Sequence, residues 1–250
     1  MSEAAGWAEV EQQFARFAAA GRRARLWLRD DDAVAPSPAL DRLIALCARH
    51  EVPVLLAVIP AGAGPALASR LVSAALATPC QHGFAHANHA PPGQKKREYG
   101  PDRPLAALRA ELAAGRDRLQ ALFGVRLAPV FVPPWNRIDA EAARLLPGLG
   151  FRALSVFGGP PAPIAGLNRL DCRLDIMDWH GGRGGREHGA LAGELARHLA
   201  EAFVSDEPVG VLGHHLVHDE TAWGFLDTLL ARSAGRPGAC WMPVGQLLAA

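Results

Sequence analysis

Acidic and imidazole side chains gather at three places where an apolar, strand-like run of the sequence ends. The first is the acidic run 30–32 (three Asp residues), the second contains His82 and His86, and the third is the pair His214 and His215. Adjacent carboxylates repel one another unless a cation compensates their charge, and neutral imidazole is the commonest ligand of zinc and similar ions. If the strands form one barrel, their ends meet at one face, which predicts a single metal-assisted hydrolytic site.

Each of these patterns also has a plainer interpretation. The acidic run could be a solvated turn or a helix cap before Pro36, because Asp often caps helices. His82 and His86 are four residues apart, so both rings can reach one ion if the backbone between them makes a helical turn; they could equally be two hydrogen-bonded loop residues. The two patterns together favour the metal site.

Two further stretches place polar and aromatic side chains at predicted strand ends. Residues 175–179 read Asp-Ile-Met-Asp-Trp, and residues 131–136 read Phe-Val-Pro-Pro-Trp-Asn. An Asp beside a His orients the ring and raises its basicity, which suits a general acid such as His214. Trp135 and Trp179 could stack on a sugar face, although tryptophan is also commonly packed into the interior.

The elements that must position these residues alternate between strand and helix. We expect strands at 26–28, 54–59, 79–82, 129–132, 153–157, 170–176, 209–212 and 239–242, and helices at 5–20, 40–47, 67–77, 104–123, 139–146, 191–203 and 222–231. The strands are apolar throughout rather than alternating, which is typical of a parallel sheet covered by helices. An α/β fold follows, with a closed or distorted (β/α)7-8 barrel as the best fit. An open doubly wound sheet is the alternative, although the first strand-to-helix turn lacks a glycine-rich phosphate cradle.

Composition limits the classes of partner and the number of domains. The chain has 250 residues, of which 50% are hydrophobic, so we expect one catalytic domain over 1–250 with an N-terminal helix at about 5–20. Its formal net charge of +1 gives no basic surplus for nucleic acid or an anionic membrane, and favours a small-molecule or glycan substrate.

The two ends of the chain and its cysteines bear on location. The N-terminus has no positive region followed by an apolar core, and no run of about 18 apolar residues occurs, so we expect a cytoplasmic protein without a membrane span. The cysteines, at 47, 80, 172 and 240, are widely scattered, so we expect buried thiols rather than disulfides or a structural zinc site.

Taken in order from Leu28 to His215, these stretches resemble the motifs of the polysaccharide deacetylase family, also called carbohydrate esterase family 4 or the NodB homology domain. The acidic pair of that family would be Asp31 and Asp32, since residues 28–33 resemble the R-x-D-D-x form of divergent members. The H-x-x-x-H motif would be His82 and His86, D-x-x-D-W would be residues 175–179, and L-x-H would be residues 212–214.

The resemblance implies a fold, a metal site and a reaction. The fold would be the distorted barrel of the polysaccharide deacetylases. Asp32, His82 and His86 would hold one divalent ion, with zinc favoured over cobalt, nickel, manganese or iron. Asp31 would be the general base and His214 the general acid, and Asp178 would tune His214. The reaction would remove an N-acyl group, with acetyl favoured, from an amino sugar or a related small substrate. The candidate substrate-binding residues are Trp135, Asn136, Trp179, His89, Asn88 and Arg137.

The chain also departs from the family pattern. An Arg usually orients the base in the third motif, where this chain has Val132, and we expect Arg29 or Arg137 to replace it. Ala33 stands in place of the usual Gly, and Gly83 in place of a hydroxyl residue. Two alternatives therefore stay open: a metal-dependent hydrolase of cyclic amides on the same barrel, and a carbohydrate-binding protein without catalysis.

Overall fold

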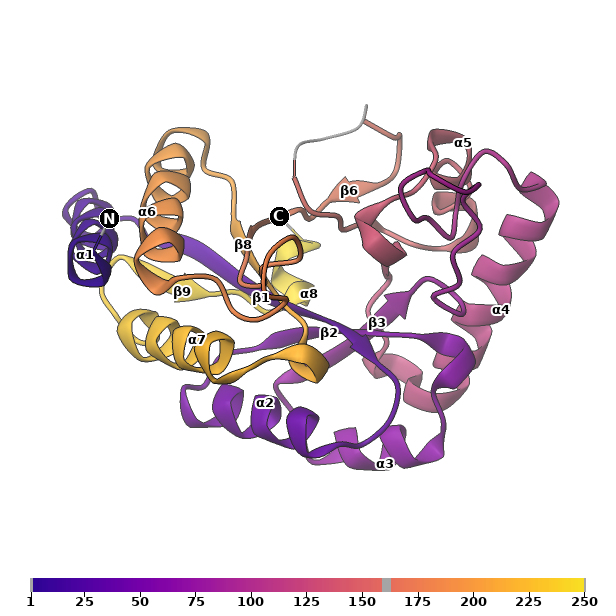
Figure 1. Cartoon of the computed structure of the whole chain (residues 1–250), viewed down its shortest axis with the longest axis horizontal. Coiled ribbons are helices and arrows are strands. Elements are labelled where there is room, and N and C mark those ends of the chain that lie inside the picture. Colours follow the sequence, from indigo (N-terminus) through magenta and orange to yellow (C-terminus); the bar gives the residue numbers. More distant parts are fainter. Residues whose placement is uncertain (1, 159–162, 250) are drawn as a thin grey trace.

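A parallel sheet curls into a partial barrel at the centre of the chain (Figure 1). The computed structural model describes residues 2–158 and 163–249; residues 1, 159–162 and 250 lie outside that description. The strands run in the order β6-β5-β4-β3-β2-β1-β8-β7, and β9 pairs with the start of β1. Their bounds are β1 Ala24–Ala33, β2 Val54–Val58, β3 Ala77–His82, β4 Val130–Val132, β5 Ala153–Leu154, β6 Asn168–Arg169, β7 Cys172–Asp175, β8 Val209–Gly213 and β9 Ala239–Trp241.

Helices cover the outside of this sheet (Figure 1), except the short C-terminal helix Val244–Leu247, which packs into the apolar cluster on the inner side of the curl. Their bounds are α1 Glu3–Ala19, α2 Pro38–Arg49, α3 Pro65–Val72, α4 Leu105–Phe123, α5 Ala140–Ala143, α6 His188–Ser205, α7 Glu220–Ser233 and α8 Val244–Leu247. The N-terminal helix α1 packs along α6, and its Trp7 ring stacks on Phe225 of α7 with the ring centroids 5.6 Å apart. The helix predicted at 5–20 is thus part of the barrel's outer layer.

The central strand β1 sorts its side chains to two faces. Leu26 and Leu28 belong to the large apolar cluster between the sheet and the helices, whereas Trp27 belongs to the cluster inside the curl. Because successive strand residues point to opposite faces, Arg29 and Asp31 share the inner face with Trp27. Asp30 shares the outer face with Leu28. The acidic run therefore does not act as one cluster.

The predicted (β/α)7-8 architecture is confirmed, and most predicted elements appear within a few residues of their expected bounds. The helix expected at 67–77 instead begins at Pro65 and ends at Val72. Its early end has a physical cause, since Arg126 donates hydrogen bonds to the carbonyls of Leu71, Ala74 and Ala77, where the chain turns into β3. The two-residue strand β6 and the four-residue helix α8 were not expected, because elements so short leave no periodic signal.

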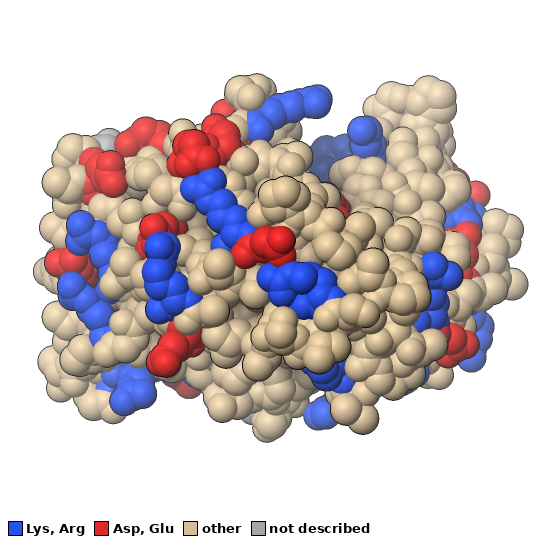
Figure 2. Space-filling model, turned by 90° about the horizontal axis from the view of Figure 1, so that it is seen from below, with Lys and Arg blue, Asp and Glu red and all other residues tan. Residues whose placement is uncertain are grey.

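The thiols and the surface charges fit the expectations from composition. All four cysteines are free, and Cys47, Cys80 and Cys172 are buried. On the face seen in Figure 2, basic and acidic side chains lie interspersed, and ion pairs such as Arg42–Glu220 and Arg49–Asp227 neutralise many of them. Within the described ranges, none of the helices combines the length and the apolar composition that crossing a bilayer requires.

Candidate metal and acid–base site

Three predicted ligands lie together at the carboxyl ends of β1 and β3. Asp32 Oδ1 is 3.0 Å from His82 Nε2 and 3.3 Å from His86 Nε2. One ligand atom from each of the three residues lies within 4.8 Å of the other two. An Asp-His-His set of this size can hold one divalent ion and leave open coordination positions.

The backbone at Asp32 explains how two adjacent carboxylates reach the same site. Strict alternation would send Asp32 to the outer face, away from Asp31. The pairing of β1 with β2 shifts register between Asp30 and Ala33, and Asp32 has a φ of 72°. A strand irregularity of this kind re-aims a side chain, and Asp is among the residues that tolerate a left-handed conformation. Asp32 thereby turns toward the histidines.

The loop between the two histidines is not helical. The condition set from the sequence, a helical turn between them, is therefore not met, and the loop brings the two rings together in another way. His82 ends β3, and both Gly83 and His86 adopt positive φ values, of 56° and 55°. The buried carboxylate of Glu98 accepts hydrogen bonds from the backbone N–H groups of Phe84, Ala85 and Ala87, at 3.0, 2.8 and 3.2 Å. Sequence reasoning missed Glu98, because nothing in its spacing ties it to the histidines. It holds the loop that presents His86.

Gly83 is required by this loop. A side chain there would have to adopt a left-handed backbone, and its Cβ would lie 2.0 Å from Glu98 Oε2 and 2.5 Å from the Pro134 ring. Only glycine avoids both the conformational cost and the overlap. The departure from a hydroxyl residue at this position is thus explained by the close approach of Glu98.

The ligand atoms of Asp32, His82 and His86 have the chemistry that a cation requires. The His82 Nδ1 atom lies 3.0 Å from the Val132 carbonyl, which only accepts, so Nδ1 carries the proton. The lone pair of His82 Nε2 then faces Asp32 Oδ1, and two acceptors 3.0 Å apart need a proton or a metal between them. When a proton occupies that position, His82 is charged; burial alone would raise the pKa of Asp32, but the hydrogen bond and charge of His82 then hold it below its usual range.

Arg29 contacts Asp31, which is the contact expected of a residue that replaces the Arg missing at Val132. It is fully buried; its Nε lies 2.9 Å from Asp31 Oδ1, and its Nη2 donates to Asp31 Oδ2 at 3.0 Å. Its remaining nitrogen contacts are to Ser155 Oγ at 2.7 Å and Asn136 Oδ1 at 2.6 Å. The other expected substitute, Arg137, is exposed and donates to the Lys96 carbonyl instead. Asn136, a predicted substrate contact, uses its carbonyl oxygen to hold Arg29.

His214 faces the same carboxylate from the end of β8. Its Nε2 lies 3.9 Å from Asp31 Oδ2, and the Trp179 ring meets its imidazole edge-on with the centroids 4.6 Å apart. The Trp179 indole N–H donates to Asp175 Oδ2 at 2.8 Å. Burial raises the pKa of Asp175, while a charged His214 acts to lower it. Asp175, Trp179 and His214 form one contact set.

The described contacts do not connect Asp178 to His214. Its Oδ1 accepts hydrogen bonds from the backbone N–H groups of His180 and Gly181, which lie on an exposed turn. These bonds lower the pKa of the Asp178 carboxyl. Asp175, the first acid of the same motif and the last residue of β7, is connected to His214 through Trp179 instead. The sequence signal for this choice was available, since a residue that ends a buried strand faces the barrel mouth.

The other predicted substrate contacts divide into two groups. Trp135 has a φ of 55°, which is unusual for a bulky residue, and its ring lies 4.4 Å from that of His86. It therefore borders the metal ligands. Asn88 caps its own loop by accepting from the N–H groups of Ala90 and Arg97, and His89 is exposed beside it. The described contacts do not connect Asn88 or His89 to the metal ligands.

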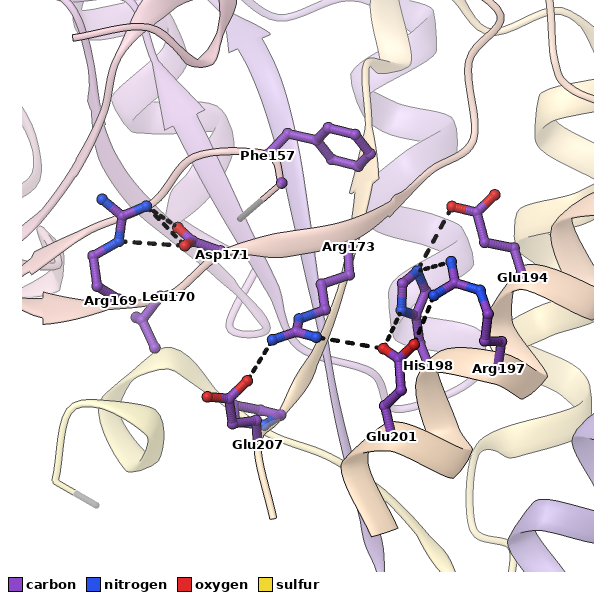
Figure 3. A pocket seen from close by; sticks show the side chains of 12 residues that line it. Phe157, Arg169, Leu170, Asp171, Arg173, Glu194, Arg197, His198, Glu201 and Glu207 are labelled. Atoms are coloured by element: carbon purple, nitrogen blue, oxygen red, sulfur yellow. Dashed lines mark hydrogen bonds and ion pairs between the residues drawn. The ribbon is translucent and has the colours of Figure 1, made fainter. Parts of the chain in front are cut away.

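A separate cavity of about 580 Å³ opens between β7, α6 and the start of β8 (Figure 3). Its charged groups already pair with one another: Arg169 with Asp171, Arg173 with Glu201 and Glu207, and His198 with Glu194 and Glu201. It lies at the amino end of β8, whereas His214 follows the carboxyl end of that strand. The cavity and the candidate site are therefore distinct.

Glu194, which lines this cavity, makes the stability of the fold depend on pH. A hydrogen bond from His198, together with Arg186, lowers the pKa of Glu194 from its ordinary 4.5 to about 2. A lowered folded-state pKa stabilises the fold above the unfolded value and loses that effect as pH falls. We expect Glu194→Gln to cost about 1 kcal/mol at pH 7, since the pair is partly open to solvent, and the cost to shrink as pH falls from about 4.5 toward 2.

Urea unfolding of Glu194→Gln and wild type at several pH values measures this effect. The exposed Glu9 on α1 supplies the matched variant Glu9→Gln, which should follow wild type at every pH. A cost of Glu194→Gln that stays constant down to pH 3 would contradict the assignment.

Comparison with known proteins places the fold. No family model and no curated protein sequence matches the chain. Solved structures do match: a proposed polysaccharide deacetylase from Mycobacterium smegmatis aligns with a TM-score of 0.67 at 18% identity, over 90% of this chain and 88% of the other. A family 4 acetyl xylan esterase from Clostridium thermocellum, in complex with a cobalt ion, aligns with a TM-score of 0.54 at 16% identity, over 90% of each chain.

A third similar structure is a family 4 carbohydrate esterase pseudoenzyme from Bacillus anthracis. It aligns with a TM-score of 0.59 at 15% identity, over 90% of this chain and 66% of the other. The resemblance read from the sequence motifs is therefore confirmed at the level of the fold, and the chain has the fold of the polysaccharide deacetylases of carbohydrate esterase family 4.

Proposed function

We propose that the chain is a metal-dependent deacylase that removes an N-acetyl group from an amino sugar or a related small substrate. One observation carries this proposal. The Asp31 carboxylate, which Arg29 holds, lies 3.9 Å from the His214 imidazole, beside the cluster of Asp32, His82 and His86. Acid, base and metal ligands at one barrel mouth are the parts that hydrolysis of an amide needs.

Asp32, His82 and His86 would hold the ion. A divalent cation bound there supplies Lewis-acid chemistry, which polarises a carbonyl and acidifies water. Zinc is the favoured ion for a set of two imidazoles and one carboxylate, and the similar structure with cobalt supports a divalent metal.

Asp31 would take the proton of the attacking water. The Arg29 guanidinium and the Ser155 and Asn136 contacts behind it keep that carboxylate in one orientation. His214 would donate a proton to the departing amine. Asp175, through its contact with Trp179, would set the environment of the His214 ring.

The rim of the site supports a sugar substrate. Trp135 and Trp179 border the metal ligands and the proposed acid, respectively, and Trp179 is 42% exposed. An exposed indole offers an apolar face that can stack on a sugar ring while its N–H stays hydrogen-bonded. We propose these two rings, with Asn136, as the substrate-facing residues.

The main alternative is a binding protein that keeps the pocket without turnover; one of the similar structures, from Bacillus anthracis, is a pseudoenzyme. Its support in this chain was the Val in place of the orienting Arg. Because Arg29 already pairs with both oxygens of Asp31, that argument loses its force.

Acetate release from a panel of N-acetylated amino sugars and their oligomers tests the proposal. We expect wild type to release acetate, and Asp31→Asn to lower kcat by about 10²- to 10⁴-fold while it retains the metal. The exposed Asp117 on α4 supplies the control Asp117→Asn, which should retain full activity. Tight binding of a sugar by metal-loaded wild type, with no cleavage of any member of the panel, would favour the binding protein.

A further inference from the structure

Asp30 is a buried carboxylate that the proposed chemistry does not use. It lies on the outer face of β1, whereas Arg29 and Asp31 lie on the inner face, and only 1% of its surface is exposed. His215, directly after the proposed acid, is equally buried at 1%. Both residues belong to the acidic and histidine runs of the sequence, yet neither faces the metal ligands.

The two side chains join β1 to the turn that follows β8. His215 Nδ1 hydrogen-bonds to Asp30 Oδ1, and the His215 backbone N–H donates to Asp30 Oδ2 at 2.9 Å. Gly213 lies opposite Asp30 in the strand pairing, and a Cβ there would lie 2.9 Å from Asp30 Oδ2. The carboxylate thus binds both the side chain and the backbone of His215.

A second contact fixes His214, which lies between Gly213 and His215. The backbone N–H of His214 donates to His218 Nε2 at 3.0 Å, and the His218 ring packs edge-on against Trp223 of α7. His214 is therefore held through its own N–H and through the residue that follows it. Its imidazole can then keep one direction toward Asp31.

Stability alone does not account for this pair. Buried charged pairs can often be replaced by apolar side chains without loss of stability, because desolvation offsets most of their attraction. The leucines and valines of β1, β2 and β8 on the same face make an apolar pair a ready alternative. A pair that apolar side chains could replace, and that fixes the residue next to the proposed acid, points to a role in orientation.

We propose that Asp30 and His215 are positioning residues, which hold the turn after β8 so that the His214 imidazole stays aligned with Asp31. This inference rests on the proposed function for its effect on turnover. Its structural part, the restraint on the turn, is independent of any reaction. The hydrogen bond from the Nδ1 edge of His215 carries the effect, since His215 Nε2 has no partner within the described residues.

Three variants separate orientation from packing. His215→Asn keeps an N–H near the Nδ1 position, His215→Leu keeps volume without a donor, and Asp30→Leu/His215→Leu also removes the buried charge. All three are compared with wild type for kcat, KM, metal content and unfolding midpoint, at a temperature where each is folded. Amide hydrogen exchange of a peptide spanning residues 213–218 supplies a readout that needs no substrate.

If the pair positions His214, both leucine variants lose kcat by about 10- to 100-fold with little change in KM or metal content, and His215→Asn retains most activity. Exchange in residues 213–218 becomes at least about tenfold faster in the leucine variants only, as expected when a local restraint is lost. A double leucine variant with wild-type kcat and wild-type exchange overturns the inference. If wild type has no deacylase activity, the proposed function fails, and unchanged exchange in the leucine variants still decides against the restraint.

Discussion

His86→Ala should purify with little or no divalent metal, whereas wild type should contain about one ion per chain. His86 and His82 are the nitrogen donors of the three-residue cluster, and His86 Nε2 lies 3.3 Å from Asp32 Oδ1. Loss of a residue that merely supports a ligand typically weakens metal binding by about 10- to 100-fold, so loss of the ligand itself should cost at least as much. Elemental analysis of protein purified without chelators measures the content.

A matched variant keeps this test specific to the site. His89→Ala removes an exposed imidazole from the same loop, three residues further on, and should keep the wild-type metal content. Acetate release should fall with the metal in His86→Ala and should not recover when zinc or cobalt is added. Equal metal content in His86→Ala and wild type would rule out the Asp32-His82-His86 site.

Arg29→Met should destabilise the chain strongly and abolish most activity. The guanidinium is fully buried against Asp31, which is itself 1% exposed, so its removal leaves a buried carboxylate without a partner. Breaking a buried pair in this way typically costs about 3–5 kcal/mol. Urea unfolding gives the loss of stability, and steady-state kinetics on whatever fraction stays folded gives the loss of kcat.

Two companion variants identify the cause. Arg29→Lys keeps the charge but not the planar fork that reaches Asp31, Ser155 and Asn136, so it should retain more stability than Arg29→Met while kcat stays low. Asp31→Asn in the Arg29→Met background removes the unpaired charge and should recover part of the lost stability, a coupling that a double-mutant cycle measures. If the losses of unfolding free energy in Arg29→Met and Asp31→Asn simply add in the double variant, the contribution of Arg29 to stability does not come from its contact with Asp31.

The fold was predictable because its signals are local. Apolar runs such as 54–59 and amphipathic runs such as 104–123 specify strand and helix by periodicity alone, and their alternation favours a parallel sheet. The carboxyl ends of parallel strands gather at one side of a barrel. The sequence by itself therefore determined that acids and histidines from the ends of β1, β3, β7 and β8 would share one region of the molecule.

Tertiary structure decided which of those side chains meet. Of three consecutive Asp residues, Asp31 faces the site by strand alternation and Asp30 faces outward. The shift of register and the positive φ at Asp32 turn that third carboxylate toward the site as well. Periodicity carries no signal for such an irregularity, since it depends on how β2 and β8 pair on either side of β1. The assignment of Asp31 and Asp32 came from family resemblance, and only the backbone supplies its physical reason.

Contacts between distant segments settled the supporting residues. Arg29 meets Ser155 and Asn136, and Glu98 hydrogen-bonds the loop of His86. Asp175 rather than Asp178 is connected to His214, through Trp179. Arg29 is 126 and 107 residues from Ser155 and Asn136, whereas Asp175 and Asp178 are three residues apart in one motif. Burial makes such hydrogen bonds obligatory only once the barrel has formed. Sequence alone identified the groups capable of chemistry, and the packing around them determined which groups would be held in place and by what.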